Sequence, residues 1–404
     1  MPELSGLLVV VGVAFAVPFL LGLRPATRVP SVVLEIVAGI VLGPGLLGVV
    51  ELDQAIEVIA LVGLGFVLFL AGLEVDFAQL RGPVLRLALA GFAVSAAIAA
   101  LVALALGAAG LVQTPLLVAV VLCATALGVL VPVLKDAGEL SSAFGQLVIA
   151  AGSVADVGAI VLLSLFFSGE GGAASTAVLV GGLLAVALLA YGLLRGAGRS
   201  RAVRRDLMAL DDTSAQIRVR GAMLLLIGFA ALAEGLGLEL ILGAFVAGAV
   251  LSLLDRDGAK DHPDFRPKLD ALGFGFFIPV FFVATGVAFD LDALRRETSS
   301  FAMVPLFVVA LLAARGLPAL LYRRRLGSRL ALVAGLMQAT SLPLIVAATA
   351  IGVEGGLLDT AEQAALITAG LISVLVFPAA ALTLLSGGRE PAVAPRAAMG
   401  RLSG

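Results

Sequence analysis

The sequence predicts an all-α, polytopic membrane protein with about thirteen transmembrane helices. Of its 404 residues, 61% are hydrophobic and 13% are charged, and the mean hydropathy is +1.15. A chain of this composition has too little polar surface to cover a soluble globule. The apolar runs are about 20 residues long, as a helix needs to cross a hydrocarbon core about 30 Å thick. The alternating pattern of a membrane β-barrel is absent.

Each apolar run predicts one helix, because a helix satisfies its backbone hydrogen bonds internally, as the bilayer interior requires. The runs follow one another along nearly the whole chain. The predicted spans are residues 4–22, 31–50, 57–74, 84–109, 114–134, 143–168, 175–195, 217–234, 238–254, 272–289, 302–322, 329–352 and 360–386.

Basic residues lie almost entirely on one side of the predicted bilayer. Loops after odd-numbered helices and the C-terminal segment hold 23 of the 26 Lys and Arg residues. Loops after even-numbered helices hold only Arg295 and Arg296, and Arg315 lies within a helix. By the positive-inside rule, this asymmetry predicts an N-terminus outside and a C-terminus in the cytoplasm, in a bacterial cytoplasmic membrane.

Three pairs of segments predict an inverted-topology repeat. The matches align Gly72 with Gly286, Thr125 with Thr340, and more weakly Gly39 with Gly248. The second segment of each pair lies seven predicted spans after the first. Because seven is odd, the two copies have opposite orientations in the membrane. Such repeats are typical of secondary transporters, whose substrate sites lie near the midplane where the repeats meet. Ancestral duplication in a protein with another role is the alternative.

The repeat sets the predicted organisation of a single cation/proton exchanger membrane domain, residues 1–404. We expect a first repeat over 4–168 and a second over 216–386. A linker helix and a cytoplasmic basic loop occupy 175–215, and a short cytoplasmic tail occupies 387–404.

The fifth and twelfth spans each combine polar residues with a proline, which predicts two crossed, discontinuous helices. Unwinding there frees backbone carbonyls and half-helix ends to face an ion. A proline kink, with Ser and Thr bonded to their own helix, is the alternative. The residues concerned are Thr125, Gly128 and Pro132 in the fifth span, and Gln338, Thr340, Ser341 and Pro343 in the twelfth.

Two charges of opposite sign, Asp156 and Arg315, lie near mid-depth in their spans. A charge at the centre of a membrane helix costs about 2.5–3.5 kcal/mol on insertion scales and marks a functional site by default. We expect the two to be charge partners, with a purely structural pair as the alternative. Glu35 lies near the cytoplasmic surface and is expected in helix packing, whereas Glu74 and Asp76 close a helix there and are expected to be solvated.

Asp156 is the predicted shared ion and proton site. A carboxylate can hold a proton or a metal cation but not both, which is the basis of antiport. Ser153 lies one turn before Asp156 on the same helical face. Together with Thr125 and the carbonyls of the unwound segments, it would complete an oxygen shell for a hard monovalent cation. The chain has no Cys or His cluster for a transition metal, and we expect no cofactor beyond the transported Na⁺ or K⁺ and H⁺.

Five segments resemble the membrane domain of the monovalent cation/proton antiporter-2 family, the Kef and Nap type. They are "RVPSVVLEIVAGIVLGPGLLG", "GLGFVLFLAGLEVDF", "LVPVLKDAGELSSAFGQLVIAAGSVADVGAIVLL", "LGAFVAGAVLS" and "FFIPVFFVATGVAFDL". The resemblance implies a homodimer of thirteen-helix subunits. It also implies a scaffold of helices one to three and eight to ten, and a core of helices four to six and eleven to thirteen that moves like an elevator.

Within this resemblance, Asp156 matches the family's ion-binding aspartate, and Arg315 stands where many members carry a buried lysine. Two departures follow, since Ala155 replaces a second polar or acidic residue and an arginine does not release its proton. We therefore expect electroneutral exchange of one proton for one cation. Many members also carry a cytoplasmic nucleotide-binding domain that this sequence lacks, so gating of that kind would require a separate cytoplasmic regulatory subunit.

Three functions remain open from the sequence. The first is Na⁺ or K⁺/proton antiport, with Gln338, Thr340 and Ser341 joining the site from the second repeat. The second is a Kef-like potassium efflux pore gated by a separate subunit, and the third is a transport-inactive sensor or scaffold. The sequence shows no phosphate loop, zinc-ligand spacing or nucleophile triad, which argues against a soluble enzyme. Membrane lipid is the expected surrounding, and no nucleic-acid partner is expected.

Overall fold

The computed structural model describes residues 4–23, 30–75, 82–167, 172–199, 216–258, 265–291 and 298–386. Within these ranges the regular structure is entirely helical, which confirms the predicted fold class. Eight helices are long and apolar enough to cross a membrane, and two shorter apolar helices accompany them. Each of the thirteen predicted spans contains one helix or consecutive helices, but the span predicted over 31–50 is too long, because its helix ends at Leu42 before the turn at Gly43. The basic loop up to residue 215, Asp76 and the tail 387–404 lie outside the described residues.

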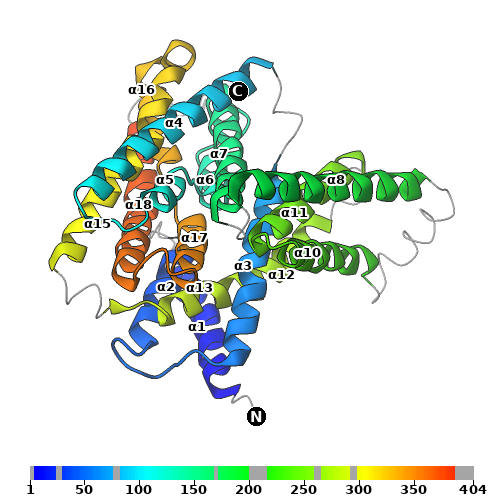
Figure 1. Cartoon of the computed structure of the whole chain (residues 1–404), viewed down its shortest axis with the longest axis horizontal. Coiled ribbons are helices and arrows are strands. Elements are labelled where there is room, and N and C mark those ends of the chain that lie inside the picture. Colours follow the sequence, from blue (N-terminus) through cyan, green and yellow to red (C-terminus); the bar gives the residue numbers. More distant parts are fainter. Residues whose placement is uncertain are drawn as a thin grey trace, which may run out of the picture.

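The described helices form two groups (Figure 1). One group, which we call the scaffold, contains α1 (Leu4–Gly22), α2 (Ser31–Leu42), α3 (Gln54–Glu74), α10 (Ile217–Gly235), α11 (Leu240–Gly258), α12 (Phe265–Leu272), the π-helical η1 (Gly273–Phe277) and α13 (Ile278–Val287). The closest packing in this group joins α3 to α11 and α2 to α13.

The second group, the core, carries the buried charges. It contains α4 (Gly82–Ala108), α5 (Pro115–Leu122), α6 (Leu127–Asp136), α7 (Ala143–Phe167), α15 (Thr298–Leu311), the π-helical η2 (Leu312–Gly316), the 3₁₀-helical η3 (Leu317–Tyr322), α16 (Arg323–Gln338), α17 (Pro343–Glu354) and α18 (Thr360–Ser386). The remaining helix, α8 (Gly172–Arg199), packs against α11 and α7 and runs to the right above α10 and α11 in the view of Figure 1.

Two glycine crossings hold the scaffold together. Gly39 of α2 meets Gly286 of α13 so closely that a Cβ at either position would overlap a backbone carbonyl of the other helix. Gly72 of α3 and Gly248 of α11 meet in the same way. Small residues allow membrane helices to approach at backbone distance. The glycines aligned by the repeat thus occur at two equivalent crossings, as an inverted repeat requires.

The two predicted helix breaks are present and cross one another. Residues 123–126 separate α5 from α6, and residues 339–342 separate α16 from α17. The backbone N–H of Ala126 donates a hydrogen bond of 2.9 Å to the carbonyl oxygen of Thr340. Pro343 is the first residue of α17, where its missing N–H costs no helical hydrogen bond. In the fifth span the break comes before Gly128 and Pro132, because α6 begins at Leu127.

Candidate ion-binding site

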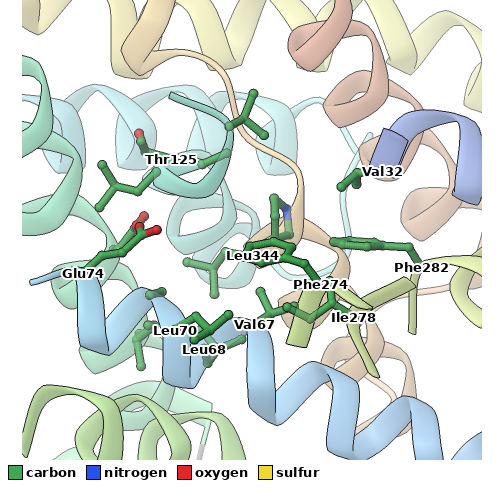
Figure 2. A pocket seen from close by; sticks show the side chains of 17 residues that line it. Val32, Val67, Leu68, Leu70, Glu74, Thr125, Phe274, Ile278, Phe282 and Leu344 are labelled. Atoms are coloured by element: carbon green, nitrogen blue, oxygen red, sulfur yellow. The ribbon is translucent and has the colours of Figure 1, made fainter. Parts of the chain in front are cut away.

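Asp156 lies in the middle of α7 and is only 6% exposed. It lines a cavity of about 90 Å³ between the scaffold and the core. The core contributes Asp156 and Ile160 of α7, the first helix break and the start of α17. The scaffold contributes apolar residues of α2, α3 and α13, among them Val67 and Phe282 (Figure 2). Among the described residues that line it, Asp156 and Glu74 are the only carboxylates and nearly all the others are apolar.

Glu74 is a site residue that the sequence analysis missed. It ends α3, half-buried, and its Oε2 is buried without a hydrogen-bond partner. In Figure 2 its carboxylate points into the cavity from the end of α3. The expectation that Glu74 is solvated is therefore wrong, because its carboxylate lines the cavity between the scaffold and the core. The repeat gives no signal for it, since the aligned segment of the second repeat carries Ala288 at this position.

The Asp156 carboxylate has one oxygen without a protein partner. The backbone of Thr125 hydrogen-bonds to the carboxylate, whereas Oδ1 is buried and accepts no hydrogen bond. Ser153, one turn earlier on α7, is also buried. A buried carboxylate oxygen without a donor is costly unless a proton or a cation binds it. Asp156 is thus arranged to take a ligand of positive charge.

Arg315 is completely buried, but it binds hydroxyl groups rather than Asp156. Its Nε and Nη2 donate to the Thr125 hydroxyl at 3.0 and 2.8 Å, and its Nη1 donates to the Ser95 hydroxyl at 3.3 Å. In the described part of the chain no direct ion pair joins Arg315 to Asp156. The two charges interact through space. The predicted charge partnership is therefore indirect here, because the guanidinium is already bonded to two hydroxyls.

The Thr125 hydroxyl is fully occupied. A hydroxyl has one hydrogen to donate and two lone pairs to accept with. The hydrogen goes to the carbonyl oxygen of Gln338 at 2.8 Å, and Arg315 occupies the accepting side with two N–H groups. No lone pair remains for a cation. The prediction that this hydroxyl joins the oxygen shell needs correction, and Thr125 faces Asp156 through its backbone.

The polar residues of the second break are not among the cavity-lining residues. The backbone carbonyl of Thr340 accepts a hydrogen bond from the N–H of Ala126 in the first break. The backbone carbonyl of Gln338 accepts one from the Thr125 hydroxyl. The backbone N–H of Ser341 donates to the Ser373 hydroxyl of α18 at 3.1 Å. The second break reaches the cavity through Pro343 and Leu344 instead. Direct ion binding by Gln338, Thr340 and Ser341 remains a prediction without a geometric counterpart in this conformation.

The chain matches the family described as "Sodium/hydrogen exchanger, transmembrane" over residues 11–386, nearly its whole length. It belongs to the sodium/hydrogen exchanger family. This membership agrees with the multi-pass membrane protein that the sequence predicts. The match includes both helix breaks, Asp156 and Arg315.

Individual relatives agree with this family. This chain is 31% identical over 391 residues to the putative Na⁺/H⁺ antiporter YjbQ of Bacillus subtilis, covering 93% of this chain and 62% of the relative. It therefore spans less than two thirds of that protein's length. It is 27% identical over 359 residues to the Na⁺/H⁺-K⁺ antiporter GerN of Bacillus cereus, covering 86% and 88% of the two chains.

The fold of this chain is similar to that of a solved antiporter. The sodium proton antiporter MjNhaP1 from Methanocaldococcus jannaschii, solved at pH 8, superposes with a TM-score of 0.68 and 19% identity. The alignment covers 94% of this chain and 99% of the other. At this identity, the similarity shows the fold alone.

Proposed function

We propose that this exchanger moves Na⁺ or K⁺ in one direction and protons in the other, using Asp156 as the shared site. The observation that carries this proposal is the unpartnered Oδ1 of Asp156 in a cavity between the scaffold and the core. A proton or a cation satisfies that oxygen, and each excludes the other. The names of YjbQ and GerN support this exchange, and that of GerN supports K⁺ as a further cargo.

The ligands of the cation would be oxygens from both helix groups. Asp156 and Glu74 supply carboxylates, Ser153 supplies a hydroxyl, and the unwound residues after Leu122 supply backbone carbonyls. Oxygen ligands suit hard cations. The described residues hold no cluster of three or more His, Cys, Asp or Glu side chains that would favour a transition metal.

Transport would follow from movement of the core against the scaffold, in the manner of an elevator. The contact between the two groups at the cavity is almost wholly apolar, with Val67 and Phe282 lining it from the scaffold and Ile160 from the core. Such surfaces slide without breaking ion pairs. Asp156 would travel with the core, whereas Glu74 would remain with the scaffold. With the cytoplasmic C-terminus that the basic loops predict, Glu74 marks a cavity that opens toward the cytoplasm.

The exchange would be electroneutral, one proton for one cation. Only Asp156 travels as a titrating carrier, because Ala155 is apolar and Arg315 keeps its proton. The net charge of the moving core is then the same with either cargo. A homodimer and a separate cytoplasmic regulatory subunit remain predictions for this chain.

The test is reconstitution of the purified protein into liposomes that contain a pH-sensitive dye. Lithium, sodium, potassium and rubidium are added in turn after a proton gradient is established. We expect dye recovery with sodium or potassium in the wild type and none with Asp156→Asn. Conductance far above carrier turnover would indicate a gated potassium pore instead. No dye recovery in either the wild type or Asp156→Asn would indicate a protein that does not transport. Equal recovery in both would mean that exchange does not depend on Asp156.

A further inference from the structure

A continuous chain of buried hydrogen bonds connects four segments of the core. It runs from Ser95 of α4 to Arg315 of η2, then to Thr125 in the first break and to the carbonyl of Gln338 at the end of α16. Each of these side chains is at most 2% exposed. Ser95 itself is not among the residues that line the cavity. The chain therefore begins outside the ion site and ends at the crossing of the two breaks.

The backbone around Arg315 departs from a regular α-helix. Leu312–Gly316 forms a π-helical turn, a feature often found at functional sites because it redirects a side chain. Gly316 of this turn packs against Gly335 of α16, where an added Cβ would lie 2.8 Å from the Gly316 carbonyl oxygen. This close approach brings the end of α16 within reach of Thr125.

We propose that Ser95 is a positioning residue for ion exchange, which holds Arg315 on Thr125 and away from Asp156. This inference rests on the proposed function of Asp156. Arg315 is a buried cation that needs acceptors, and Asp156 Oδ1 is a buried acceptor without a donor. A direct ion pair between them would satisfy both groups. It would also occupy the oxygen that the cargo must use.

Ser95 and Thr125 together prevent that pairing. Thr125 accepts from two nitrogens of the guanidinium and Ser95 accepts from the third, so the planar group is held at both edges. Removal of the Ser95 hydroxyl frees Nη1, whose new acceptor in this proposal is the unpartnered Oδ1 of Asp156. An internal ion pair of this kind competes with the cation for the same oxygen. A saturating cation concentration displaces it, so the apparent KM rises whereas the maximal rate is retained.

The experiment compares Ser95→Ala with Ser164→Ala in proteoliposomes. Ser164 is a matched control, because its hydroxyl is equally buried in the core but forms no hydrogen bond. We expect Ser95→Ala to raise the apparent KM for the transported cation about three- to tenfold, the effect of losing one hydrogen bond of ordinary strength, because the Nη1–Oγ distance is a long 3.3 Å. The maximal rate should stay within about twofold of wild type. Ser164→Ala should match wild type in both quantities.

A second pair of variants separates positioning from packing. Ser95→Thr and Ser95→Val have nearly the same volume and shape, but only the threonine keeps the hydroxyl. We expect the threonine variant to have a several-fold lower KM than the valine variant, at similar melting temperatures. An equal KM for both, in protein that exchanges ions, would overturn the role of Ser95 and leave the proposed function intact. A wild-type protein without cation-coupled proton movement, identical to Asp156→Asn, would overturn both.

Discussion

The backbone N–H of Ala126 donates a hydrogen bond to the carbonyl oxygen of Thr340 at 2.9 Å, so the two unwound segments are joined where they cross. This bond connects the first and second repeats at the level of the ion site. The Thr125 hydroxyl makes a second connection to the carbonyl of Gln338 at 2.8 Å. Both breaks are therefore tied to each other within the core, the helix group that carries Asp156.

Asp156→Asn should abolish exchange without unfolding the protein. Asparagine keeps the size of the side chain but loses the charge that binds a cation. We expect cation-coupled proton flux to fall by at least about 100-fold, because this step depends on one carboxylate. The melting temperature in detergent should not fall, because a buried charge is removed. Flux above one tenth of wild type would contradict the assigned role.

Glu74→Gln should weaken cation binding, and Glu57→Gln should not. Glu74 lines the cavity at the end of α3, whereas Glu57 is exposed in the first turn of the same helix. We expect the apparent KM of the Glu74 variant to rise about 5- to 50-fold, since an ionic ligand contributes more than a neutral hydrogen bond. Concentration series in proteoliposomes measure this. Equal KM values for the two variants would exclude Glu74 from the site.

Gly72→Ala should destabilise the scaffold. The new Cβ would overlap the carbonyl of Phe245 on α11, which forces the two helices apart at a cost of about 1–3 kcal/mol. Gly228→Ala in α10 is the control, because nothing lies within 4 Å of the new methyl group. Thermal unfolding in detergent should show a lower midpoint for the first variant only. A similar midpoint for both would mean that the crossing is looser than described.

Exchange should be insensitive to membrane potential. If one proton replaces one cation on Asp156, no net charge crosses the membrane in a cycle. A carrier of two protons per cation would instead gain or lose about 2.3 kcal/mol per 100 mV. Sodium-driven proton flux is measured in liposomes clamped at zero and at an inside-negative potential. Rates that differ by more than about twofold would disprove electroneutral exchange.

The parts predictable from sequence were those with a strong contrast to their surroundings. Asp156 and Arg315 are charges inside apolar runs, and the breaks pair polar residues with prolines at repeated positions. Glu74 was missed because an acid at a helix end is usually solvated, and only tertiary packing covers this one. Ser95 carries no signal at all, because a serine in an apolar helix commonly bonds its own backbone.

The hydrogen-bond partners of Arg315 were not predictable from the sequence for the same reason, since tertiary packing determines them. The sequence supplies its charge and its depth, but two hydroxyls from distant segments decide where its donors point. Thr125 lies 190 residues away along the chain and Ser95 lies 220 residues away. Local sequence patterns do not predict contacts between residues so far apart along the chain. Direct pairing with Asp156 was the simplest expectation from charge alone, and the hydrogen bonds show a different arrangement.

The central claim is that cation and proton share Asp156, and proton release on cation binding tests it most directly. Purified protein in weakly buffered detergent solution is titrated with the transported cation while the pH is followed. We predict release of close to one proton per cation bound in the wild type and none in Asp156→Asn. Cation binding without proton release, or the same release from the Asn variant, would contradict the account.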